Sequence, residues 1–133
     1  QVAILCLGTR LEECKKAAEI LSIKGVELTI VDARFAKPLD EKLIMEVATT
    51  HEAVITIEEG SIGGFGSHVS QLLSERGVFD KGLKFRSMIF PDIFLDQDSP
   101  EAMYKKAGLD SLSIVSKIED LIKSNVVLKK IKI

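Results

Sequence analysis

Two adjacent carboxylates and a cluster of glycines have the clearest potential for chemistry in this sequence. Glu58 and Glu59 follow the apolar run 53–57, and four glycines then occur between residues 60 and 66. Backbone N–H groups in such a turn, at the start of a helix, can bind a phosphate, and carboxylates can act as general acids or bases. The turn therefore either holds a ligand or packs tightly against another part of the protein.

The motifs that would make this turn a phosphate site are incomplete. Residues 64–66 begin a G-x-G-x-x-G pattern, but Val69 stands at the third glycine position, and no Gly-Lys-Ser/Thr sequence occurs. Glu58 and Glu59 do not suit an acid–base pair, because neighbouring residues of a strand point to opposite faces. We expect a packing or helix-capping role for these carboxylates.

A second polar stretch, residues 32–40, follows another apolar run and adds positive charge. Arg34 and Lys37 should lie at the carboxyl edge of a sheet, and Asp32 is close enough to form a structural ion pair with Arg34. His51 ends a predicted helix, where it answers the helix dipole or caps carbonyl groups, so we assign it no catalytic role.

Composition excludes several classes of function. The chain has 133 residues, 46% of them hydrophobic, a net charge of −2, no Trp and one Tyr, which does not suit a nucleic-acid-binding surface. No apolar run is long enough to span a membrane, and no signal peptide is visible. Cys6 and Cys14 are too few and too far apart for a metal site, and we expect buried thiols in a reducing cytosol.

Apolar runs that alternate with amphipathic stretches must position these residues. We expect strands at residues 2–7, 26–33, 53–57 and 83–90, each followed by a helix. Right-handed crossovers then give a three-layer α/β/α fold around a mostly parallel sheet of about five strands. Residues 1–124 form the domain, and residues 125–133 form a tail that is an edge strand or disordered. Because the chain starts without Met and directly in a strand, we expect it to be a piece of a longer protein.

Three polar residues are predicted N-caps of helices. These are Thr9, with Glu12 completing a capping box, Asp40, and Ser99, which precedes a proline at the first helical position.

Four blocks in a fixed order give the chain a family resemblance. They are Leu7–Arg10, Asp32–Asp40, Ile57–His68 and Asp98–Glu101. As a set they resemble the C-terminal, transketolase C-terminal-like domain of 1-deoxy-D-xylulose-5-phosphate synthase, over residues 2 to about 122.

The resemblance implies a parent enzyme of three domains that uses thiamine diphosphate and Mg²⁺. Such a transferase decarboxylates pyruvate and joins the remaining two-carbon unit to glyceraldehyde 3-phosphate, giving 1-deoxyxylulose 5-phosphate and CO₂. The product feeds the biosynthesis of isoprenoids, thiamine and pyridoxal. A location in the bacterial cytoplasm or in a plastid is implied as well.

The resemblance also implies that the chemistry lies in the other two domains. No Gly-Asp-Gly cofactor motif occurs in this chain, so we predict no catalytic, cofactor-binding or metal-binding residue here, and no activity for the chain alone. Its implied role is to form a homodimer and to support the cofactor-binding domains, with no nucleic-acid or membrane partner. The candidate residues for these domain and dimer interfaces are Arg34, Lys37, Glu59, Gly63, Gly64, Phe65, Gly66 and His68.

Two alternatives stay open at this point. The chain could be the equivalent domain of a transketolase or of a 2-oxoacid dehydrogenase E1 β subunit, which share the Glu59-Gly60 pair. It could instead be a free-standing α/β module that uses the glycine turn to bind an anion.

Overall fold

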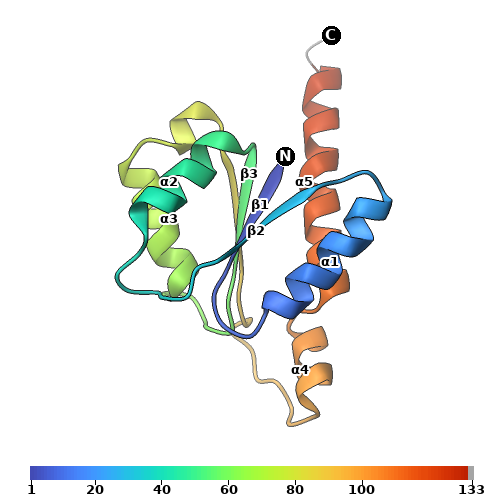
Figure 1. The fold of residues 1–133 in the computed structure, drawn as a ribbon. Helices are drawn as coiled ribbons and strands as arrows, with labels where there is room; N and C mark the ends of the chain where they lie inside the picture. Colours follow the sequence, from blue (N-terminus) through green and yellow to red (C-terminus); the bar gives the residue numbers. More distant parts are fainter. Residues whose placement is uncertain (132–133) are drawn as a thin grey trace.

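A computed structural model describes the backbone of residues 1–131 and the surroundings of side chains 1–123. Strands and helices alternate along the chain (Figure 1). Their order is β1 (Val2–Cys6), α1 (Leu11–Ile23), β2 (Leu28–Asp32), α2 (Glu41–Thr50), β3 (Ala53–Ile57), α3 (Phe65–Glu75), a 3-10 turn η1 (Phe79–Lys81), β4 (Lys84–Met88), α4 (Pro100–Lys106) and α5 (Ser111–Ile131). The four expected strands are all present, each within a residue or two of its predicted bounds.

The strands form one parallel sheet in the order β2-β1-β3-β4. Every residue of β1 and β3 is buried, whereas β2 and β4 at the two edges are partly exposed. Central strands covered on both faces must be apolar throughout, which explains the unbroken runs in the sequence. The predicted three-layer parallel fold is therefore confirmed, although the described residues contribute four strands to the sheet rather than about five.

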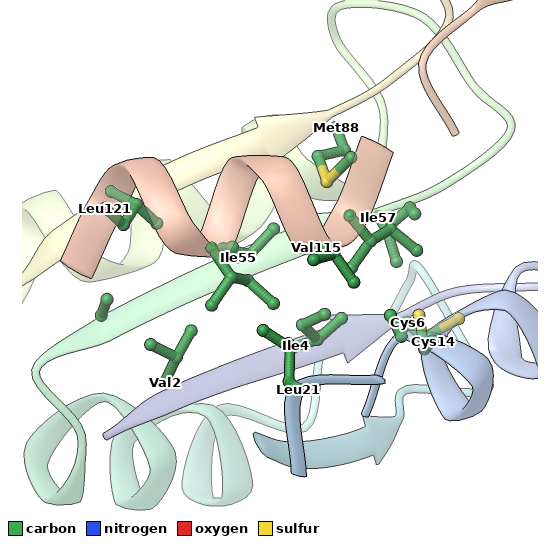
Figure 2. Packing of buried hydrophobic residues seen from close by; sticks show 14 of the residues in the cluster. Val2, Ile4, Cys6, Cys14, Leu21, Ile55, Ile57, Met88, Val115 and Leu121 are labelled. Atoms are coloured by element: carbon green, nitrogen blue, oxygen red, sulfur yellow. The ribbon is translucent and has the colours of Figure 1, made fainter. Parts of the chain in front are cut away.

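Alternate side chains of the central strands enter two separate cores. One core lies under α1 and α5, and Figure 2 shows Val115 and Leu121 of α5 on the side of the sheet to which Ile4 and Ile55 point. The other lies under α2 and α3, where Leu5 and Val54 pack beside Phe65. Because successive strand residues point to opposite faces, each central strand stabilises both helical layers.

Polar caps fix the start of two helices as expected, but not of a third. Asp40 accepts a hydrogen bond from the Leu43 N–H at 3.0 Å, and Ser99 accepts one from the Ala102 N–H. The predicted Thr9 cap is wrong, because the hydroxyl of Thr9 accepts hydrogen bonds from the side chain of Arg10 instead. The N-cap residue of α1 is Arg10, and it makes no side-chain capping bond.

The tail at residues 125–133 was predicted to be an edge strand or disordered, and its described part is helical. Helix α5 continues without a break through residues 125–131, and residues 132–133 lie outside the described part of the chain. Extending an existing helix gains one hydrogen bond for each residue that is fixed, so continuation is easier than starting a new element. Among the described residues, no helix has the length and apolar character needed to cross a bilayer.

Candidate functional site

The candidate residues lie in the loops that follow the strands. Because all four strands are parallel, these loops meet at one end of the sheet, which we call the carboxyl edge. In Figure 1 the loops after β1, β3 and β4 lie at the lower end of the sheet, opposite the N-terminus. Ligands and partners of open α/β sheets usually bind at this edge. It is therefore the candidate functional site.

The start of α3, which the sequence offered as a phosphate cradle, is occupied by the protein's own carboxylate. Glu58 is 4% exposed. Its two oxygens accept hydrogen bonds from the N–H groups of Phe65, at 3.0 Å, and Gly66, at 2.6 Å. A carboxylate is stabilised at a helix N-terminus both by these bonds and by the helix dipole. The N–H groups that would bind an anion are thus already used, and the predicted capping role of Glu58 is confirmed.

Close packing against Glu58 explains two of the four glycines. A Cβ atom on Gly60 or on Gly64 would overlap with Oε1 of Glu58. Gly66 is constrained from the other side, because a Cβ there would lie 2.6 Å from Oγ1 of Thr56 and 2.8 Å from Oγ of Ser87. The glycine turn is therefore closed around an internal carboxylate and against the sheet, and three of its four glycines have a packing reason; Gly63 has open space around it and a φ of +97° instead.

Glu59 points away from Glu58 and joins three elements. Its Oε1 lies 3.3 Å from Nε of Arg10 and accepts a hydrogen bond of 2.8 Å from the hydroxyl of Tyr104. The guanidinium of Arg10 also stacks over the Tyr104 ring, 3.4 Å from its centroid. This cluster holds the β1–α1 loop and α4 against the end of β3. The separation of the two carboxylates agrees with the expectation that they do not form an acid–base pair.

Sequence reasoning did not assign roles to Arg10 and Tyr104. Arg10 directly follows the first strand and its turn, so its place at the carboxyl edge could have been inferred from the βαβ pattern. Its burial, at 8% exposed, could not. Tyr104 lies 45 residues from Glu59 in the sequence, and no local pattern connects them.

The β2–α2 loop presents Arg34 and Lys37 as exposed side chains. The predicted ion pair between Asp32 and Arg34 is wrong, because in the described part of the chain Asp32 instead accepts a hydrogen bond of 3.2 Å from the backbone N–H of Arg34. Arg34 has a φ of 55°, an uncommon conformation for a residue with a side chain. The bond to Asp32 helps to hold the loop in this conformation.

The remaining candidates differ in how accessible they are. Gly63 is exposed, Gly64 and His68 are half-buried, and Phe65 and Gly66 are buried within the domain. The N–H of Gly63 donates to the hydroxyl of Ser67 at 2.9 Å. An interface role for these residues, and for Arg34, Lys37 and Glu59, stays a prediction.

His51 and the two cysteines have internal partners. Nδ1 of His51 lies 2.9 Å from the carbonyl oxygen of Val47 at the end of α2, as predicted for a capping residue. The thiols of Cys6 and Cys14 are buried and hydrogen-bonded to each other, and Figure 2 shows them side by side. This bond lowers the pKa of Cys6, whereas the same bond and burial raise the pKa of Cys14. In the described residues, no group of three or more metal-ligating side chains is placed to hold an ion.

Comparisons with known proteins agree with this architecture. A family model described as "Transketolase, C-terminal domain" matches residues 1–114. A solved structure described as "Split gene transketolase, inactive beta4 tetramer" is 31% identical in sequence and covers 90% of this chain, with a TM-score of 0.80. The chain spans 38% of the length of that relative.

Proposed function

Since this chain belongs to the transketolase C-terminal domain family, we propose that it is the C-terminal domain of a thiamine-diphosphate-dependent 1-deoxy-D-xylulose-5-phosphate synthase. In this proposal the parent is a transferase that releases CO₂ from pyruvate and adds the two-carbon unit to glyceraldehyde 3-phosphate, in the cytoplasm of a bacterium or in a plastid. The domain forms a homodimer and supports the two cofactor-binding domains.

The occupied glycine turn is the strongest evidence that this domain braces the cofactor-binding domains rather than binding the cofactor. Glu58 takes the N–H groups at the start of α3 that could otherwise bind a diphosphate. The described residues also lack a carboxylate cluster that would suit Mg²⁺. The start of α3 therefore does not fit the diphosphate group, and the described carboxylates do not fit its metal ion. The same observation weighs against a free-standing module that binds anions at this turn.

The choice of synthase over transketolase rests on the sequence, because the run Gly-Gly-Phe-Gly-Ser-His at residues 63–68 resembles the synthase more closely. Residues 32–40 and 57–68 both lie at the carboxyl edge, where a partner domain would meet them. The similarity to a split-gene transketolase favours a second candidate, in which the parent is a transketolase. Such a parent would transfer a two-carbon unit between sugars and would release no CO₂ from pyruvate.

Two experiments test the proposed function. In the full-length protein that contains this chain, we expect CO₂ release from pyruvate that depends on glyceraldehyde 3-phosphate. Transfer between sugars without CO₂ release would instead identify a transketolase. In a calorimetric titration of the chain alone with thiamine diphosphate and Mg²⁺, then with glyceraldehyde 3-phosphate, we expect no binding heat. Saturable binding would contradict the supporting role and would direct mutagenesis to the glycine turn.

A further inference from the structure

We propose that a second copy of this chain docks on the carboxyl edge, with the β4–α4 segment of each protomer seated against the β2–α2 loop of its partner. The inference rests on the homodimer of the proposed function and identifies the surface that forms it. We call residues 33–40 the basic loop and residues 89–99 the acidic segment.

Large apolar side chains are exposed on three of the loops at this edge. Phe35 in the basic loop is 67% exposed, Ile62 after β3 is 78% exposed, and Ile93 and Phe94 in the acidic segment are 64% and 106% exposed. Single exposed apolar residues are normal on protein surfaces, but several at one end of a sheet indicate an interaction site. Phe94 has no cover from its own chain and is therefore suited to insert into a partner.

The basic loop borders a hollow that such a side chain can enter. A cavity of about 330 Å³ opens there, between the end of β2 and the first turns of α2 and α3. Its lining combines the exposed Arg34, Phe35 and Pro38 with the half-buried Leu43 and the buried Phe65. Asp32 and Asp40 also line it, and each accepts a hydrogen bond from a backbone N–H group of its own loop or helix. A largely apolar lining beside an unpaired basic side chain fits an aromatic side chain that is flanked by carboxylates.

The acidic segment has that character. Asp92 and Asp96 lie two residues to either side of Phe94 and are exposed. Neither forms an ion pair or a hydrogen bond among the described residues, and the same is true of the side chains of Arg34 and Lys37. Opposite unpaired charges on two surfaces of the same molecule are what a self-complementary interface requires.

The strand order allows both contacts to form at once. The basic loop follows β2 and the acidic segment follows β4, which are the two edge strands of the sheet. Three strand spacings, about 14 Å, separate them. A two-fold axis parallel to the sheet normal can lie just beyond the carboxyl edge, level with the gap between β1 and β3. It places the β4 end of one sheet opposite the β2 end of the other. Ile62 then lies near the axis, where it can meet its own copy.

Charge reversal tests the pairing directly by sedimentation equilibrium of the chain. One variant carries Arg34→Glu and Lys37→Glu, and the other carries Asp92→Lys and Asp96→Lys. Each variant alone places like charges together in both contacts, so we expect self-association at least about tenfold weaker than in the unmodified chain. An equimolar mixture restores opposite charges at both contacts, and its heterodimer should form within about threefold of the original affinity.

Apolar variants provide a matched pair. Phe94→Ser should weaken self-association about tenfold because it removes the inserted side chain. Ile23→Ser is the control, since Ile23 is 89% exposed at the far end of α1, and it should leave association unchanged. Circular dichroism checks that every variant is folded.

Each outcome bears on a different proposal. A chain that stays monomeric at millimolar concentration would overturn both the dimerisation role and this inference, and would assign the edge to another domain of the parent. A dimer that is insensitive to the charge reversals would overturn this surface and leave the dimerisation role intact. Variants that are monomeric both alone and when mixed would overturn the proposed pairing of the two loops.

Discussion

The carboxylate of Glu58 is the single group whose removal should disturb the carboxyl edge most. It accepts two backbone N–H bonds in a site that is 4% exposed. Glu58→Ala leaves both donors buried without an acceptor, at about 1–3 kcal/mol each. Loss of the negative charge at the start of α3 adds up to about 1 kcal/mol. We therefore expect a loss of about 2–7 kcal/mol, a large fraction of the total stability of a domain.

Glu58→Gln separates the two contributions. The amide keeps one acceptor oxygen but turns an NH₂ group toward the other backbone donor, so it should cost about half as much as the alanine variant. The free energy of unfolding is measured by urea titration, with an unchanged slope showing that the unfolded state is comparable. Glu52→Gln is the matched control, because the Glu52 side chain is 73% exposed, and its variant should stay within about 0.5 kcal/mol. A Glu58→Ala loss below about 1 kcal/mol would refute the assigned role.

Three further predictions concern the surroundings of this site. Gly66→Ala should destabilise the domain by about 1–3 kcal/mol in urea unfolding, because its methyl group would meet two side-chain hydroxyls of the sheet; an unchanged midpoint would contradict the packing. Tyr104→Phe should cost about 0.5–1.5 kcal/mol, since the hydroxyl bond to Glu59 is lost while the ring stays on its cation; no loss in Tyr104→Phe beside a clear loss in Tyr104→Ala would assign the effect to the ring instead. A hydrogen bond donated by Lys16 holds the pKa of the Glu13 carboxyl below 4.5. The stability that Glu13 contributes is therefore present above pH 4.5 and is lost as the pH falls through the lowered pKa. In acid unfolding, Glu13→Gln should therefore show a smaller pH dependence below pH 4.5, and an identical curve would contradict this contribution.

The sequence by itself determined the elements and their arrangement in layers. Unbroken apolar runs such as Val2–Cys6 and Ala53–Ile57 indicate strands covered on both faces. The intervening helical periodicity then leaves a parallel sheet as the simplest solution. Asp40 and Ser99 were predictable as caps, because a cap bonds to a backbone group only three residues away. Local periodicity and local hydrogen bonds are properties that a single stretch of chain carries.

The tertiary structure decided which polar groups bond to each other at the carboxyl edge. Thr9 and Glu12 form a plausible capping box in sequence, yet the Thr9 hydroxyl accepts a hydrogen bond from Arg10, whose guanidinium also pairs with Glu59. Likewise, Asp32 bonds to the backbone of Arg34 rather than to its side chain, since the loop turns through a positive φ. Each choice depends on which groups the folded chain brings within bonding distance.

The role of the glycine turn shows the same division. Four glycines in seven residues indicate a tight turn with a close approach, but the sequence left open whether a ligand or the protein itself makes that approach. In the folded chain Glu58 fills the space. Burial strengthens the preference of the α3 N–H groups for a charged acceptor, and Glu58 is held beside them at the end of β3. Spacing in the sequence therefore determined that a turn exists, and only the fold decided what it encloses.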